Sequence, residues 1–205
     1  MAANRVLTIP NVISVARLLC VPVFLWLLWG RDEVLWAAGL LAVLGATDWV
    51  DGYIARRWDQ GSELGKMLDP IADRVLLLAA AVALLVEDLP TAVDIFIWIV
   101  LIREVVIAVA TLALAAGGAR RIDVVWAGKA GTLAIMFALP IFLWADAIDS
   151  DGWYAFVSFA GWCFAIPGVV LGYYAAWKYI PAARAALAEG RSGHAPDAGM
   201  QEVPR

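Results

Sequence analysis

Four aspartates have the type and spacing needed for chemistry: Asp48, Asp51, Asp69 and Asp73. The first two are three residues apart and the last two are four apart, so in a helix each pair lies on one face. Each pair adjoins an apolar stretch that could enter a membrane, where a carboxylate costs at least ~2.5–3.5 kcal/mol. The connection between the two helices is short, so we expect an antiparallel hairpin in which both acidic pairs point into one pocket. Four carboxylates in one pocket repel one another, so we expect them to bind hard divalent cations, Mg²⁺ or Mn²⁺.

Small residues and one arginine accompany these acids. Gly52 directly follows the first acidic pair, Gly65 lies one turn before the second, and Ala55 keeps the same helix face open. A residue without a bulky side chain lets a ligand approach the backbone closely. Arg56 places a forked cation beside the carboxylates, where it could bind phosphate oxygens. This combination indicates a diphosphate site, at which metal ions bridge phosphate oxygens and stabilise a leaving group.

Membrane helices must position these residues. Of 205 residues, 63% are hydrophobic and 17% are charged, against ~45–50% and ~25% in soluble domains. This composition excludes a soluble enzyme and a disordered chain, and the length fits about six spans of ~20 residues. We therefore expect an all-α integral membrane protein with six transmembrane helices, at residues 13–30, 34–54, 68–86, 91–115, 124–145 and 153–180.

The two ends of the chain differ in character. The first apolar run is too long for a signal peptide, so we expect it to be retained, preceded by a short interfacial segment. Residues 1–181 are predicted to form the membrane domain. Residues 182–205 contain several glycines and prolines, which predicts a flexible cytoplasmic tail.

Charge predicts the orientation in the membrane. Basic residues cluster at both ends and on the second and fourth connections, whereas the odd-numbered connections are mostly acidic: Asp32, Glu33, Glu87, Asp88, Asp146, Asp149 and Asp151. Because basic loops stay in the cytoplasm, both termini and the carboxylate site should be cytoplasmic, in a multi-pass membrane protein. The net charge of −4 is a poor match for a nucleic-acid binder.

The segment that contains the four aspartates resembles the signature of the CDP-alcohol phosphotransferase family. The matching positions are Asp48, Asp51, Gly52, Ala55, Arg56, Gly65, Asp69 and Asp73. The resemblance implies that a phosphatidyl group is transferred from CDP-diacylglycerol to an alcohol acceptor, with release of CMP, in glycerophospholipid biosynthesis. It also implies a six-helix layout, and members of the family are often homodimers.

The same resemblance implies roles for the matching residues. The four aspartates would coordinate two divalent metal ions, Mg²⁺ or Mn²⁺. Asp73 would also be the general base that deprotonates the acceptor hydroxyl. The CDP site would be formed by Asp48, Gly52, Ala55, Arg56 and Gly65.

Three cations outside the signature are candidates for holding the acceptor. Arg17, in the segment Pro10-Asn11-x-x-Ser14-x-x-Arg17, and Lys129 resemble positions of phosphatidylglycerophosphate synthases and cardiolipin synthases. Arg103, followed by Glu104, resembles an arginine of the former group. We expect these three cations to bind the phosphate of glycerol 3-phosphate. Because adjacent residues on a helix do not face each other, Arg103 and Glu104 are not expected to form a direct ion pair.

Other functions remain open. Thr111 stands where glycerophosphate enzymes have a further arginine, so phosphatidylglycerol, as in cardiolipin synthases, and inositol phosphate are alternative acceptors. A divalent-cation transporter is the rival of another class, since acids within a membrane can mark an ion path. A transporter predicts acids at several depths, whereas these four share one depth beside Arg56, which would repel a passing cation.

Overall fold

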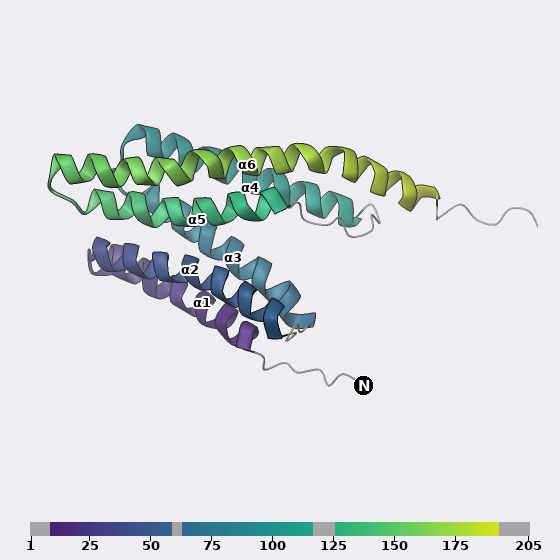
Figure 1. Ribbon diagram of the computed structural model, residues 1–205, viewed down its shortest axis with the longest axis horizontal. Coiled ribbons are helices and arrows are strands. Elements are labelled where there is room, and N and C mark those ends of the chain that lie inside the picture. Colours follow the sequence, from purple (N-terminus) through teal and green to yellow (C-terminus); the bar gives the residue numbers. More distant parts are fainter. Residues whose placement is uncertain (1–8, 59–62, 117–125, 193–205) are drawn as a thin grey trace, which may run out of the picture.

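The computed structural model describes the backbone of residues 9–58, 63–116 and 126–192, and the side chains of residues 12–47, 71–112 and 126–178. Within these ranges the fold is entirely helical (Figure 1). It consists of α1 (Ile9–Leu25), the π-helical segment η1 (Trp26–Gly30), α2 (Val34–Trp58), α3 (Glu63–Leu84), α4 (Thr91–Ala116), α5 (Trp126–Asp146) and α6 (Asp151–Ser192).

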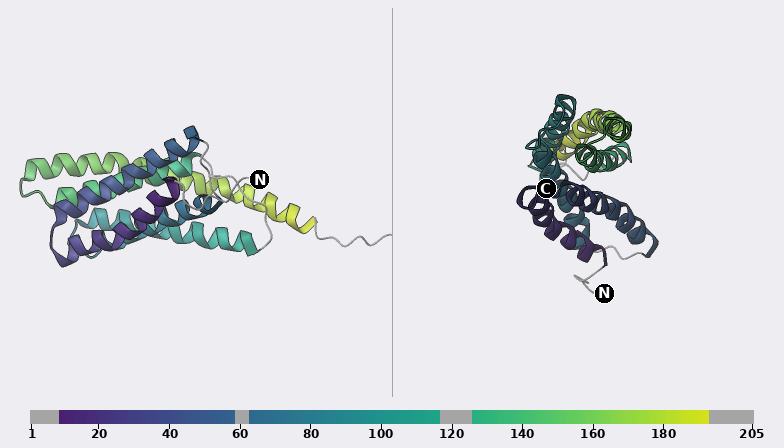
Figure 2. Two further views of the ribbon diagram at one scale, coloured as in Figure 1. Left: turned by 90° about the horizontal axis from the view of Figure 1, so that it is seen from below. Right: turned by 90° about the vertical axis from the view of Figure 1, so that its left-hand side faces the viewer.

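The helices form two groups that pack side by side. One group contains α1, α2 and α3, and the other contains α4, α5 and α6. The end-on view in Figure 2 shows the purple and blue helices of the first group beside the teal and green helices of the second. Contacts of α2 with α5, and of α3 with both α4 and α5, join the groups. Helix α3 thus connects the two groups, with α1 on one side and α4 and α5 on the other.

The closest packing joins α5 and α6, the antiparallel pair of the second group. A Cβ atom on Gly131 of α5 would lie 2.8 Å from the carbonyl oxygen of Gly168 and 2.9 Å from the backbone nitrogen of Gly172. Only a residue without a side chain allows two helix backbones to approach this closely, as is common between helices in membranes. The three glycines therefore set the separation of α5 and α6.

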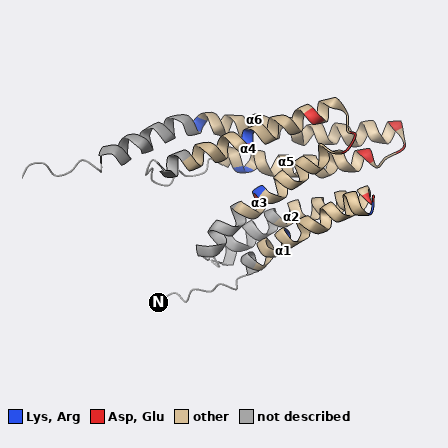
Figure 3. Ribbon diagram, turned by 180° about the vertical axis from the view of Figure 1, so that it is seen from behind, with Lys and Arg blue, Asp and Glu red and all other residues tan. Residues whose placement is uncertain are grey.

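Much of the bundle surface is apolar. Four helical segments within the described residues are long and apolar enough to cross a membrane: Val12–Gly30, Thr91–Leu112, Trp126–Asp146 and Asp151–Lys178. The described part of α2 contains a shorter apolar stretch, Val34–Thr47. Large side chains such as Trp36 and Trp126 are 69% and 77% exposed, which suits a surface covered by lipid. Described acidic residues gather at the end formed by the short connections after η1, α3 and α5 (Figure 3).

Four helices extend four or more residues beyond the predicted apolar stretches. Helix α1 begins at Ile9, α2 continues to Trp58, α3 begins at Glu63, and α6 continues to Ser192. The acidic pairs, predicted at the end of one helix and the start of the next, therefore lie within continuous helices. Hydropathy detects the apolar part of a helix, whereas backbone hydrogen bonding carries the helix on into polar sequence.

Candidate functional site

Asp73 is the one aspartate of the four whose side chain lies within the described residues, and its partner is Arg17. The guanidinium of Arg17 donates a hydrogen bond from Nη1 to Oδ1 of Asp73, which links α1 to α3. The Arg17 side chain is 1% exposed, whereas that of Asp73 is 25% exposed. Ser14, one turn earlier on α1, is also fully buried. The structure thus joins the predicted general base to a cation predicted to bind the acceptor.

The remaining signature residues are placed by their backbone alone. Asp48, Asp51, Gly52, Ala55 and Arg56 lie on α2, and Gly65 and Asp69 lie on α3. Their side chains fall outside the described residues, so their roles stay predictions. Because the two helices are continuous at these positions, the spacings of three and four residues do place each acidic pair on one helix face.

The four aspartates form a donor set that suits a hard divalent cation. Among described side chains, no group of three or more potential metal ligands occurs, and only one of the four aspartates belongs to that part of the chain. A set of four carboxylates offers oxygen ligands alone, which is the chemistry that Mg²⁺ and Mn²⁺ favour. The partial exposure of Asp73 leaves that carboxylate accessible from outside the bundle core.

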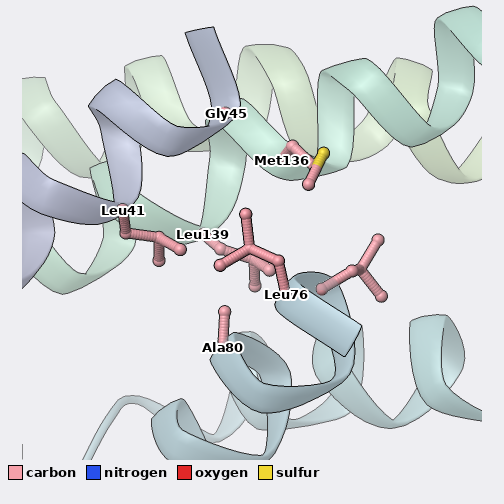
Figure 4. Close-up of a pocket in the computed structure, with 7 residues that line it drawn as sticks. Leu41, Gly45, Leu76, Ala80, Met136 and Leu139 are labelled. Atoms are coloured by element: carbon pink, nitrogen blue, oxygen red, sulfur yellow. The ribbon is translucent and has the colours of Figure 1, made fainter. Parts of the chain in front are cut away.

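Apolar side chains fill the bundle interior on the side of Asp73 that leads toward Leu84, the end of α3. Leu76, Leu77 and Ala80 follow Asp73 on the same side of α3 and are 0–2% exposed. With α2 and α5 they surround a cavity of about 10 Å³, whose lining side chains are all apolar (Figure 4). Such a space is too small and too apolar for a substrate or a hydrated ion. The cavity is therefore a packing defect beneath the carboxylate, within a larger apolar core.

Arg103 is buried on α4 and bonds to its own neighbour. Its Nη1 lies 2.8 Å from Oε1 of Glu104, with the two side chains 4% and 10% exposed. The expectation that adjacent residues do not pair was therefore wrong. That expectation holds for side chains standing out from a helix surface. Here burial excludes water, so the long arginine side chain folds across to the nearest carboxylate, because an unpaired buried charge is costly.

Two further helices enclose the Arg103 guanidinium. Its Nη2 reaches Oγ1 of Thr132 on α5 at 3.5 Å. On α6, a Cβ at Gly172 would lie 2.6 Å from the Arg103 Nε. Nε itself is buried with no hydrogen-bond partner among the described residues. Gly172 was not among the predicted site residues, although its spacing from Gly168 is the small-residue pattern of a close helix contact.

The third predicted acceptor cation is in a different environment. Lys129 lies in the first turn of α5 and is exposed.

By helix rise, Asp73 lies about 17 Å from the α3 end at Leu84, and Arg103 lies about 18 Å from the α4 start at Thr91. Asp73 and Arg103 therefore lie at similar distances from the ends of two helices that are joined by the short connection 85–90.

Comparisons with known proteins show which family the sequence resembles. The family model described as CDP-alcohol phosphatidyltransferase matches residues 7–173. A protein of Streptomyces coelicolor named cardiolipin synthase (CMP-forming) is 38% identical over 186 residues, which cover 86% of this chain and 83% of that protein. The CDP-diacylglycerol–glycerol-3-phosphate 3-phosphatidyltransferase of Escherichia coli K12 is 34% identical over 191 residues, covering 87% and 96%.

Proposed function

The chain belongs to the CDP-alcohol phosphatidyltransferase family, and we propose that it transfers the phosphatidyl group of CDP-diacylglycerol to an alcohol acceptor, releasing CMP. The observation that carries this proposal is the family match over residues 7–173, which includes the acidic pairs of α2 and α3. A carboxylate of those pairs, Asp73, is accessible and held by a buried cation.

The proposed reaction uses the four aspartates together. Asp48, Asp51, Asp69 and Asp73 would hold two divalent ions, Mg²⁺ or Mn²⁺, which when bound neutralise charge on the diphosphate and on the leaving CMP. Asp73 accepts the proton of the acceptor hydroxyl. The hydroxyl oxygen then attacks the phosphatidyl phosphorus, and the bond from that phosphorus to CMP breaks. Gly52, Ala55, Arg56 and Gly65 would bind the CDP moiety.

The acceptor is proposed to be a glycerol that carries a phosphate group. Glycerol 3-phosphate is the acceptor that the sequence favours, and the exposed Lys129 is suited to its phosphate. Phosphatidylglycerol is the second candidate, because two of the three expected cations, Arg17 and Arg103, already have carboxylate partners. The 38% identity to a cardiolipin synthase supports this candidate as well.

The membrane arrangement is proposed from the charge pattern. Six spans with both termini in the cytoplasm of a bacterium would place the carboxylate site on the cytoplasmic side. The membrane domain would cover residues 1–181 and the flexible tail residues 182–205, although α6 itself extends to Ser192. A homodimer remains a prediction from the family resemblance.

The apolar core below Asp73 favours an enzyme over a cation transporter. An ion path needs polar or charged groups at successive depths. In the described part of the chain, the side chains that follow Asp73 toward the opposite end of α3 on the core side are leucine and alanine, and they are buried. An ion leaving the carboxylates in that direction would meet hydrocarbon.

The test is release of CMP from CDP-diacylglycerol by the purified protein with Mn²⁺ present. Asp69→Asn should abolish release, because it removes a metal-binding carboxylate, whereas Asp149→Asn, in an exposed acidic connection, should leave it unchanged. Separate reactions with glycerol 3-phosphate, phosphatidylglycerol or inositol phosphate identify the acceptor by the lipid product. Full activity of Asp69→Asn would refute the proposed site.

A further inference from the structure

Arg17 is a buried charge that its predicted role does not explain. It is among the largest fully buried side chains of the described residues, and its segment is one of the apolar spans. A charged guanidinium within a membrane span is costly and marks function or a specific partner. A ligand phosphate in solution or in a headgroup cannot reach a side chain that is 1% exposed. Arg17 must therefore act through the groups it contacts.

One group that it contacts is the carboxylate proposed to be the general base. Arg17 binds Oδ1 of Asp73 across the α1–α3 interface. Asp73 keeps 25% of its side chain exposed, so the pair has one enclosed member and one accessible member. An arginine is always protonated and its donors have fixed directions. Its hydrogen bond consequently restrains the rotation of the carboxylate about its own side-chain bonds.

We propose that Arg17 is a positioning residue for Asp73. Its hydrogen bond fixes the orientation of the Asp73 carboxylate, so that the exposed part of this carboxylate is available to the metal ions and the acceptor hydroxyl. This inference rests on the proposed function for its catalytic meaning. It changes the assignment of Arg17 from binding the acceptor to orienting the base. Arg17→Lys keeps a cation and most of the side-chain volume, so it is a less disruptive change than truncation.

The kinetic test separates orienting the base from binding the acceptor. If Arg17 positions Asp73, Arg17→Gln lowers kcat for CMP release about 100-fold, the scale of a small misplacement of a reacting group. The KM for the acceptor should stay within about threefold, because that contact is not lost. Arg17→Lys, which keeps a cation, should recover part of kcat. A raised KM with unchanged kcat would overturn the proposal and return Arg17 to the acceptor site.

A binding measurement provides a second readout that does not need turnover. Mn²⁺ affinity of the full-length protein in micelles can be followed by electron paramagnetic resonance. Arg17→Gln should change the Mn²⁺ affinity more in the wild-type background than in the Asp73→Asn background. The loss of the positive charge acts in both backgrounds, whereas the loss of the restraint on the carboxylate acts only in the first. An equal change in both backgrounds would overturn the coupling of the two residues. If Arg17→Gln does not fold, the same comparison is made with Arg17→Lys.

The two proposals fail in different ways. A wild-type protein that binds Mn²⁺ but releases no CMP with any acceptor would refute the proposed function. The Mn²⁺ comparison would still show whether Arg17 acts through Asp73. A wild-type protein that releases CMP, with Arg17→Gln equal to wild type in both kcat and Mn²⁺ affinity, would refute the positioning role and leave the proposed function intact.

Discussion

The enclosure of Arg103 by Gly172 makes a sharp prediction for the substitution Gly172→Ala. The new Cβ would lie 2.6 Å from Nε, 2.8 Å from Cζ and 3.0 Å from Nη2 of Arg103. The guanidinium must therefore move by about 0.8 Å to reach ordinary contact at 3.4 Å. A shift of about 0.8 Å directed away from Glu104 would stretch the 2.8 Å bond between the two side chains beyond hydrogen-bond length.

The expected cost combines two effects. Overpacking a filled interior costs ~1–3 kcal/mol, and breaking a buried ion pair costs ~3–5 kcal/mol when one charge is left alone. Because the arginine can relax in part, we expect Gly172→Ala to lower the free energy of unfolding by roughly 2–4 kcal/mol. Unfolding of the purified protein in mixed micelles, titrated with SDS and followed by tryptophan fluorescence, measures this change.

Two controls identify the cause of the loss. Gly39→Ala is the matched substitution, because Gly39 lies within α2 and a Cβ there meets nothing within 4 Å. It should be neutral or slightly stabilising. In an Arg103→Ala background the clashing atoms are absent, so Gly172→Ala should cost much less than in wild type. The same cost in both backgrounds, or a cost no larger than that of Gly39→Ala, would refute the reasoning.

Two other substitutions test the packing that supports the site. Phe142→Ala should lower the free energy of unfolding by ~3–5 kcal/mol, because this 2% exposed ring contacts Phe96 and Trp162 edge to face. The same SDS titration measures this change, and a loss below about 1 kcal/mol would contradict the packing. Leu76→Ala should lower the free energy of unfolding by ~2–5 kcal/mol, because it enlarges the apolar cavity that Leu76 lines. CMP release by this variant should then be lost at a lower temperature than CMP release by the wild-type protein. Unchanged stability would show that the helices close over the cavity.

The sequence predicted the helices better than their polar ends. The start of α4 at Thr91 and the start of α2 at Val34 agree with prediction, because charged residues and a proline separate sharply defined apolar runs there. The prediction failed where α2, α3 and α6 continue into polar sequence. Single-sequence hydropathy contains no information about where backbone hydrogen bonds end once the side chains become polar.

Side-chain partners were beyond the reach of the sequence. Arg17 and Asp73 are 56 residues apart, and their contact depends on how α1 and α3 rotate against each other. Arg103 and Glu104 are adjacent, and a rule for exposed helices excluded a pair that burial imposes. Gly172 could have been found from its spacing with Gly168, but the arginine that fills the space beside it comes from another helix.

The apolar packing beneath Asp73 also constrains how substrates reach the carboxylates. In the described part of the bundle, buried leucine and alanine side chains close α3 on the side of Asp73 that leads to Leu84. A hydrated diphosphate cannot cross such packing, because each unpaired polar group would lose its water without replacement. At the proposed site, access would come from the opposite side, toward the end at which α2 stops and α3 begins. The CDP headgroup and the acceptor hydroxyl would then approach the carboxylates from that one side.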